Sequence, residues 1–440
     1  MYKLAQLLPA LYCRDTKWKL KEPYSIKGNR YVLQTPIKLS VNIEREIYYI
    51  DGRKEINLSV KENWDTSNNG IDYTLPKNRA GQSFYIYACF PYSVGDTPDI
   101  VLSANSTVPC GYQQYNSRKI GGFHCLCESI GDIKGHLLSG FLAGDILPAS
   151  IWDLLHRPDC DIPGLVYDEK SSKWYFIYLP SGIGVSTDSI YGGTVTDDRS
   201  WNDFVEDGGA IKMRLLTDSE FQLMADGTPE KAQIWHGNPV ITTGGHSAYF
   251  ILELDASPIP EDFIAGRILI GEKSHRTCII VSKITSTKYL CKNLGKLEDK
   301  PHLHYERKFF QKGEKITDGL NSKQCGLDYP KCTIDSRGRM VSNIGCEDCS
   351  GAFWQWLDEQ CYRMDGQDVK SCRTWGWHDL INQKGSIFGQ GTYGDSKMFA
   401  GSNWFYGKYA GSQTRSVDGF RWDKAKSVSC RFCVESRKTI

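Results

Sequence analysis

The first 120 residues contain a succession of short runs rich in β-branched and aromatic residues, and this feature constrains the fold more than any other. Turn-forming residues such as Asp51-Gly52 and Asn68-Asn69-Gly70 separate the runs. Runs of this length and spacing are typical of the strands of a sandwich or barrel. They occupy residues 31–33, 37–43, 47–50, 56–60, 84–90 and 100–102. The sequence therefore predicts a β-sandwich or barrel module over residues 1–120.

The charge of the chain is balanced, with 53 Lys and Arg residues against 52 Asp and Glu residues. This balance argues against a protein that coats nucleic acid, so we expect no nucleic-acid partner. No stretch approaches the roughly 18 consecutive apolar residues of a membrane-spanning helix, so we expect no membrane insertion. The apolar run at residues 4–11 contains Pro9 and follows a single basic residue, Lys3, which favours a docking segment over a signal peptide.

Short helices are predicted in residues 121–250, where the alternating pattern is lost. One is expected from Ala149 to His156, and a second from Trp201 to Glu206 with an acidic residue in its first turn. A third is expected after Thr217-Asp218-Ser219-Glu220, which has the spacing of a capping box. Gly227 lies where a glycine would end that helix.

Residues 251–333 return to a β pattern. Short β-branched runs recur at residues 249–254, 267–270, 277–284 and 289–291. They predict a small β domain inserted between the regions on either side.

The density of rings, glycines and cysteines rises from Asp335 onward. Apolar residues in the stretch after Gly351 follow helical spacing, and the sequence predicts a helix there. These residues are Phe353, Trp356, Leu357 and Cys361.

The segment from Gly401 to Trp422 holds six aromatic residues and four glycines in 22 positions, and its aliphatic residues are Ala410 and Val417. A core strand or helix requires aliphatic filling that this segment lacks. Rigid rings among Ser, Gly and Asn are typical of binding surfaces. The same composition suits a glycine-rich loop packed by its own rings, and composition alone does not separate the two.

The spacing Gly-x-x-Trp-x-x-Gly-x-x-x-Gly-Ser-x-x-Arg-x-x-x-x-x-x-Trp in this segment resembles the C-terminal signature of phage major tropism determinant-like proteins. That family has a C-type-lectin-like fold related to formylglycine-generating enzymes. Further similar segments lie at residues 119–127, 139–148, 242–246, 343–351, 354–356 and 391–395. The resemblance covers residues 110–250 and 335–435.

The strand patterns and the resemblance together predict a multidomain protein of the α+β and all-β classes. Residues 1–120, most of which lie outside the resemblance, are expected to attach it to the particle. The resemblance implies that residues 121–250 form the first part of a lectin-like region. Residues 251–333 also lie outside the resemblance, and their strand pattern predicts the inserted β domain. Residues 334–440 would form the C-terminal C-type-lectin-like segment that binds the receptor.

The family signature also implies roles for single residues. Glycine, tryptophan and arginine positions would form a scaffold, and the positions between them would be displayed to a receptor. The scaffold would be Trp404, Gly407, Gly411, Ser412, Arg415, Arg421 and Trp422, with Arg431 marking a last core strand that departs from the usual Gly-x-Arg. The displayed residues would be Asn403, Phe405, Tyr406, Lys408, Tyr409, Gln413, Ser416, Val417, Asp418, Phe420, Asp423, Lys424 and Lys426.

Ten of the 16 cysteines fall between Cys278 and Cys433, and their chemistry is open. Cys346-x-x-Cys349 and Cys430-x-x-Cys433 suit a zinc site, a disulfide or buried thiols, and we favour thiols because about 80 residues separate the pairs. His302-x-His304 places two imidazoles on one face of a strand, where a satisfied pair is more common than a metal site.

An enzyme is not expected. A cysteine-dependent oxidase needs a reactive thiolate pair, yet Cys430 and Cys433 lie in a predicted strand and would point to opposite faces. No convincing pair of carboxylates, phosphate-binding loop or nucleophile elbow is present. We expect no catalytic residue, cofactor or bound metal.

These patterns together predict a virion protein of a phage tail, assembled in the host cytoplasm. It would bind a host surface receptor, protein or glycan, without a covalent bond, and would contact other virion structural proteins. The family implies a homotrimer, which would strengthen weak binding through avidity. The alternative is a structural virion protein, a capsid decoration or baseplate component, whose lectin-like domain contacts neighbouring subunits.

Overall fold

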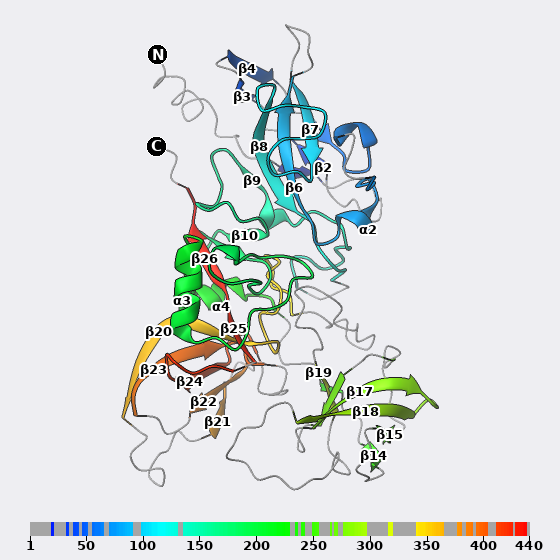
Figure 1. Cartoon of the computed structure of the whole chain (residues 1–440), viewed down its shortest axis with the longest axis vertical. Helices are drawn as coiled ribbons and strands as arrows, with labels where there is room; N and C mark the ends of the chain where they lie inside the picture. Colours follow the sequence, from blue (N-terminus) through cyan, green and yellow to red (C-terminus); the bar gives the residue numbers. More distant parts are fainter. Residues whose placement is uncertain are drawn as a thin grey trace.

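The computed structural model places β-sheets along the whole length of the molecule (Figure 1). It describes residues 19–21, 32–34, 38–43, 46–51, 55–65, 70–90, 98–130, 135–228, 234–235, 239–242, 249–254, 265, 268–271, 276–296, 316–319, 340–364, 376–380, 384–389, 393–403, 411–425 and 427–437. No helix among these residues is long and apolar enough to cross a membrane.

The N-terminal part forms three small sheets, drawn in blue and cyan at the top of Figure 1. The largest has the order β7-β6-β8-β9, and its middle strand β6 pairs antiparallel with both neighbours. Its core contains Trp64, Phe84, Ile86 and Phe123. The strands are β1 (Lys19–Lys21), β2 (Val32–Gln34), β3 (Lys38–Ile43), β4 (Glu46–Asp51), β5 (Glu55–Ile56), β6 (Ser83–Cys89), β7 (Asp99–Ser103), β8 (Ser117–His124) and β9 (Trp152–Asp153). The strands predicted at residues 37–43, 47–50, 84–90 and 100–102 are confirmed as β3, β4, β6 and β7, and β9 joins the largest sheet from beyond residue 120.

The segment predicted as a helix from Ala149 to His156 is not one. A single 3-10 turn, η2 (Pro148–Ser150), leads directly into β9, which pairs with Gly121 and Gly122 of β8. The Ser150 hydroxyl accepts a hydrogen bond from the His124 amide at 2.8 Å, which fixes the chain beside the sheet. Tertiary pairing therefore overrides local helical preference here.

The middle of the molecule contains a sheet in the order β10-β11-β26-β12, which joins distant parts of the sequence. β10 (Leu165–Asp168) and β11 (Lys173–Phe176) form a hairpin, and β26 (Phe432–Glu435) lies between β11 and β12 (Arg214–Leu215). The predicted last core strand therefore exists. It closes the sheet that begins more than 250 residues earlier.

Two helices pack beside this sheet, and both begin as the sequence predicts (Figure 1). α3 (Trp201–Ala210) starts at Ser200, and α4 (Asp218–Met224) starts at Thr217; both caps form a complete capping box. Gly227 has a left-handed φ of +80°, two residues after the Ala225 cap of α4.

The C-terminal part forms a six-stranded sheet in the order β21-β22-β24-β23-β20-β25. Its strands are β20 (Trp354–Met364), β21 (Gly376–Asp379), β22 (Ser386–Gly389), β23 (Tyr393–Ala400), β24 (Arg415–Gly419) and β25 (Val428–Cys430). The prediction of a helix after Gly351 is wrong, because β20 is an 11-residue strand. A bulge between Trp356 and Gln360 lets Trp356 and Leu357 both be buried, which imitates helical spacing.

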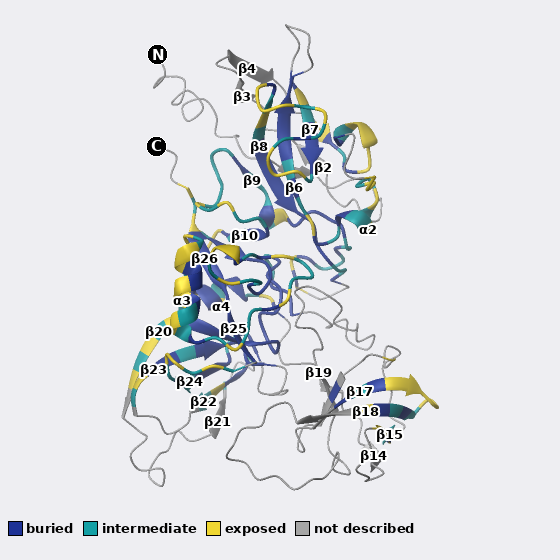
Figure 2. Cartoon of the chain, in the orientation of Figure 1, coloured by how far each residue is buried: buried dark blue, intermediate teal, exposed yellow. Residues whose placement is uncertain are grey.

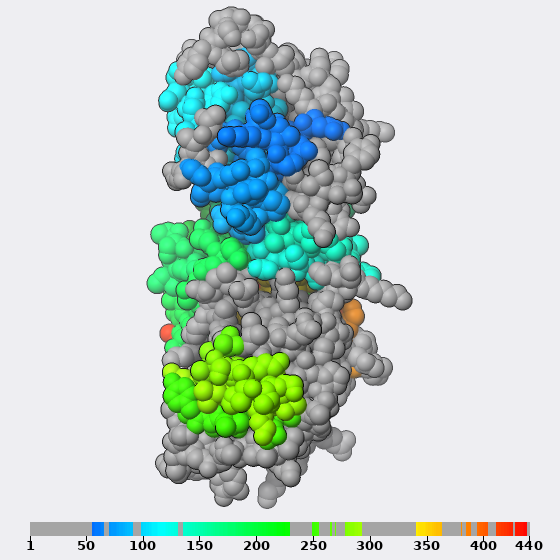
Figure 3. All heavy atoms as spheres, turned by 90° about the vertical axis from the view of Figure 1, so that its right-hand side faces the viewer, coloured from blue at the N-terminus to red at the C-terminus, as the bar shows by residue number. Residues whose placement is uncertain are grey.

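A seven-stranded antiparallel sheet stands apart at the lower right of Figure 1. Its order is β13-β19-β16-β17-β18-β15-β14, and it runs from Ile234 to Gly319, beyond the predicted limits of 251–333 on the N-terminal side. The strands are β13 (Ile234–Trp235), β14 (Pro239–Thr242), β15 (Tyr249–Leu254), β16 (Ile268–Gly271), β17 (Arg276–Lys283), β18 (Lys288–Lys296) and β19 (Ile316–Gly319). In Figure 3 its described residues lie below those of the N-terminal sheets.

Candidate functional site

The predicted binding segment lies at the end of the chain, on the six-stranded sheet and the turn that follows β24. Figure 2 shows the buried strands of this sheet beside partly exposed residues of the same region. Residues 401–403, 411–425 and 427–437 of the segment are described. Seven predicted site residues lie outside the described residues: Trp404, Phe405, Tyr406, Gly407, Lys408, Tyr409 and Lys426.

Arg415, a predicted scaffold residue, is buried at the start of β24 and ties this strand to α4. Its guanidinium Nε forms an ion pair with Asp218, the first residue of the helix. It also donates to the carbonyls of Ser412 and Thr414, at 3.0 and 2.8 Å. The guanidinium carbon lies 5.0 Å from the ring centre of Phe221. Burial lowers the pKa of Arg415, and Asp218 opposes this shift.

Arg431 lies between β25 and β26 with only 1% of its surface exposed. Its guanidinium donates to the carbonyls of Phe176 and Ile177, at 2.7 and 2.8 Å, and to the carbonyl of Glu347. It also donates to Gln355 Oε1 at 3.2 Å. One side chain therefore joins β11, the loop before β20, β20 itself and the last strand.

Gly411 is a predicted scaffold position where only glycine fits. A Cβ at this position would lie 2.3 Å from the carbonyl oxygen of Lys384. Backbone from two segments therefore meets at van der Waals distance, which requires the absence of a side chain. Ser412, the next scaffold residue, is also buried.

Six of the predicted displayed residues are at least partly exposed in the structure. They are Gln413, Val417, Asp418, Phe420, Asp423 and Lys424. The Lys424 Nζ lies 3.1 Å from Asp203 of α3. The Asp423 carboxylate accepts a hydrogen bond from the Phe420 amide at 2.7 Å, which closes the turn.

The prediction that Asn403 and Ser416 are displayed is wrong for the single chain. Asn403 is 4% exposed and bridges to Ala352, and Ser416 is 3% exposed in β24. The backbone of Ser416 pairs with Phe399 of β23 and Phe388 of β22, so the residue lies on an inner strand of the sheet. Both residues are enclosed by neighbouring strands that the local sequence does not reveal.

Trp422 also differs from its predicted place in the scaffold, because 64% of its surface is exposed. Its ring stacks on Phe420 with 5.3 Å between centres and 1° between planes. It lies in the turn after β24. Trp422 is therefore available for contact with another molecule.

Sequence reasoning missed two residues that support this turn, Lys397 and Trp201. The Lys397 Nζ lies 3.7 Å from the ring centre of Trp201, and the Arg421 guanidinium lies 5.6 Å from the same ring. Such cation–π contacts join α3, β23 and the turn. No local motif predicts them, because they form between distant segments.

The four cysteines of the two C-x-x-C motifs are free and buried in the structure. Burial raises the pKa of Cys349 to about 11 and that of Cys430 well above its usual range. The Cys349 Sγ lies 3.5 Å from the sulfur of Met224. A buried thiol with a raised pKa is a poor nucleophile, because the thiolate is the reactive form.

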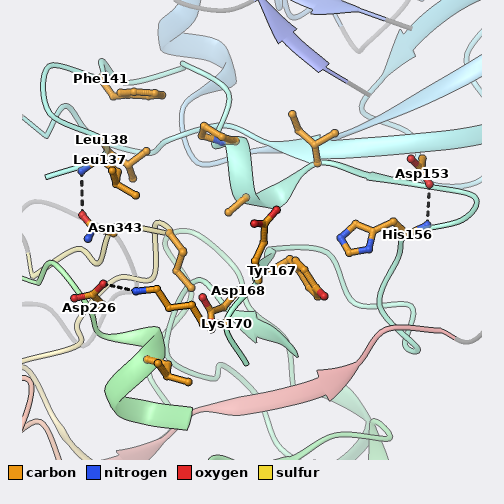
Figure 4. Close-up of a pocket in the computed structure, with 16 residues that line it drawn as sticks. Leu137, Leu138, Phe141, Asp153, His156, Tyr167, Asp168, Lys170, Asp226 and Asn343 are labelled. Atoms are coloured by element: carbon orange, nitrogen blue, oxygen red, sulfur yellow. Dashed lines mark hydrogen bonds and ion pairs between the residues drawn. The ribbon is translucent and has the colours of Figure 1, made fainter. Parts of the chain in front are cut away.

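A separate cavity of about 580 Å³ lies where the N-terminal sheets meet the central sheet (Figure 4). Leu137, Leu138 and Phe141 provide an apolar wall. At its rim, Lys170 pairs with Asp226 at 2.8 Å. No site residue predicted from the sequence lines this cavity.

Comparison with known proteins finds sequence matches to parts of the chain and structural matches to nearly all of it. Residues 65–153 match the family model described as Mtd second domain. A curated relative, the tail fiber receptor-binding protein of Bordetella phage BPP-1, is 30% identical over 193 residues. The match covers 39% of this chain and 48% of the relative, so the chain spans about half the length of that protein.

Solved structures of two Major Tropism Determinant variants match over 96% of this chain and 86% of theirs. The P3c variant is 16% identical with a TM-score of 0.51, and the I1 variant is 17% identical with a TM-score of 0.52. At such identity the likeness establishes the fold alone. Residues 65–153 thus resemble the Mtd second domain, and the chain as a whole shares the fold of the Major Tropism Determinant variants.

Proposed function

We propose that this chain is a phage virion protein that binds a host surface receptor through its C-terminal face. The observation that carries the proposal is that buried arginines hold the strands of this region together while other side chains of the same region are exposed. Arg415 and Arg431 lock the strands from inside, while Phe420, Trp422 and Lys424 remain open to another molecule. The printed name of the Bordetella phage relative, a receptor-binding tail fibre protein, supports the same function.

Binding would be non-covalent and would use rings for contact area and charged groups for complementarity. The residues in these roles are the displayed residues named above, with Trp422 added and with Asn403 and Ser416 placed in the supporting layer. We infer that the protein is not an enzyme, because its relatives are named for binding and its central thiols are buried. The proposal also includes the domain limits given from the sequence and a homotrimeric state. It further includes a location in the phage tail and assembly in the host cytoplasm.

Phage that carry Tyr406→Ala together with Tyr409→Ala test the proposal. We expect particles of normal composition with at least tenfold slower adsorption to host cells, because two ring anchors are lost. Phage with Tyr249→Ala provide a matched control, since Tyr249 is half exposed on the separate seven-stranded sheet. Unchanged adsorption of the double variant with normal assembly would refute receptor binding at this face.

The alternative function is a structural one, in which the lectin-like part contacts neighbouring virion subunits. Accessibility of the face in the intact particle separates the two. Surface labelling of a cysteine introduced in place of Lys424 would be fast on a receptor-binding face and blocked on a face buried between subunits.

A further inference from the structure

A pocket of about 230 Å³ lies between the N-terminal four-stranded sheet and the loop at residues 157–165. It is distinct from the C-terminal face and from the cavity in Figure 4. Three cationic side chains line it, namely Lys119 of β8, Arg157 and Arg437. One carboxylate, Asp161, lies in the same lining.

Arg157 is the unusual member of this group. In the part of the chain that the structure describes, no hydrogen bond or ion pair holds its guanidinium, and its Nε is buried without a partner. Burial lowers the pKa of Arg157, and the charges of Arg437 and Arg118 lower it further. Asp161 and Asp159 oppose this shift only through longer-range attraction. A partly buried guanidinium without a direct partner is costly, so an anion beside it would be stabilising.

The other two cations leave room for such an anion. Lys119 donates to the carbonyl of Ser106 at 2.7 Å, which uses one of its three N–H groups. Arg437 pairs with Asp159 at 3.2 Å, but both side chains are more than half exposed and the pair is therefore weak. The pocket thus offers several cationic donors against a single carboxylate in its lining.

The residues that line the pocket indicate the kind of molecule to which the anionic group would be attached. Trp152 and Ser83 are partly exposed among the lining residues, whereas Trp174 and Ser150 are buried. The Ser83 hydroxyl already bonds to His124 Nδ1 at 2.8 Å, so this polar group is preorganised. A ring beside a hydroxyl and guanidinium groups suits a small polar ring bearing a phosphate or carboxylate.

We propose that this pocket binds an oxyanion, a phosphate or carboxylate group carried on a sugar-sized body, with Arg157 and Lys119 as its principal ligands. The site is independent of the proposed receptor face. It would give the protein a second contact with acidic saccharides or with free sugar phosphates.

Isothermal titration calorimetry on the purified full chain tests the proposal. The probes are inorganic phosphate, glucose 6-phosphate and glucuronate, with glucose as the uncharged control. We expect binding of at least one anionic probe, weakened by added salt, and no binding of glucose. If inorganic phosphate binds as tightly as glucose 6-phosphate, the oxyanion alone accounts for the affinity. This result would overturn the part of the proposal that the ligand includes a sugar-sized group.

Arg157→Gln should lower the affinity at least tenfold, and Lys119→Gln should lower it severalfold. Lys77→Gln is the matched control, because Lys77 is an exposed cation outside the pocket. If Arg157→Gln fails to fold, Lys119→Gln decides the question. Absence of anion binding by the wild-type chain, or equal affinity in the pocket variants, would overturn the proposal. Because the readout is binding in solution, it does not depend on phage adsorption.

Discussion

The seven-stranded sheet and the C-terminal sheet are both antiparallel over most of their pairs, yet the residues that they bury differ. The described core of the first is apolar and includes Phe250, Leu252, Leu254 and Leu269. The second also buries apolar residues, such as Trp356 and Phe399, but in addition it encloses Arg415 and Arg431, whose guanidinium groups donate to backbone carbonyls. In an apolar core, the size and shape of each buried side chain affect stability. An arginine that donates to backbone carbonyls holds strands together independently of the side chains that those strands expose to solvent.

This difference explains how the C-terminal segment remains ordered with so few aliphatic residues. Carbonyl acceptors are present at every position, so the anchors do not depend on the identity of exposed neighbours. We infer that the surface of this sheet tolerates substitution better than the surface of the seven-stranded sheet.

Replacing Arg431 by Met should produce the largest effect. Several buried carbonyls would lose their donor, and the free energy of unfolding should fall by about 4 kcal/mol. Urea denaturation monitored by tryptophan fluorescence measures the change. Lys77→Met is the control and should change stability by less than about 0.5 kcal/mol, because its side chain is exposed. A loss below about 1 kcal/mol for Arg431→Met would remove the proposed contrast between the two sheets.

Replacing Leu252 by Ala should cost about 3 kcal/mol, because this residue is fully buried in the apolar core. The effect should remain within the seven-stranded sheet. Hydrogen exchange should become faster in residues 249–254 and 276–296 and remain unchanged in residues 393–403. Faster exchange in both regions would show that the two sheets unfold as one unit.

Replacing Glu220 by Gln should have the smallest effect, about 1 kcal/mol at pH 7, since it weakens one helix cap. Burial raises the pKa of Glu220, but hydrogen bonds from Arg214 and Thr217 outweigh it and lower the pKa to about 2. Because the folded-state pKa is below the ordinary value of 4.5, the stabilisation is complete above pH 4.5. It is lost as the pH falls through about 2.

Thermal unfolding of both proteins between pH 2 and 7 measures this dependence. The difference between wild type and Glu220→Gln should shrink towards the acidic end. A constant difference across this range would contradict the assigned role of the carboxylate.

Local sequence signals predicted many of the strands of the N-terminal and inserted sheets, but not β8 or β19, and they predicted the starts of α3 and α4. These features depend on residue alternation and on caps a few positions long. The resemblance to the tropism determinant family led us to expect a lectin-like fold and pointed to Arg415 and Arg431.

Features that depend on contacts between distant segments were not predictable in this way. The bulge in β20 gave Trp356 and Leu357 a helical spacing, and pairing with β8 converted the expected helix at Ala149 into a turn and a strand. The burial of Asn403 and Ser416 and the exposure of Trp422 likewise follow from which strands lie beside them. The unpaired Arg157 has no sequence signature at all.

The pairing of β26 with β11 and β12 has a consequence for how the protein is made. The central sheet that contains β11 is incomplete until residues 432–435 form β26. Contacts this far apart in sequence form slowly and cannot form until translation has passed residue 435. A ribosome that stops early therefore releases a chain whose central sheet lacks its middle strand and whose Arg431 carbonyl acceptors have no donor. Only chains that extend past residue 435 can complete this sheet.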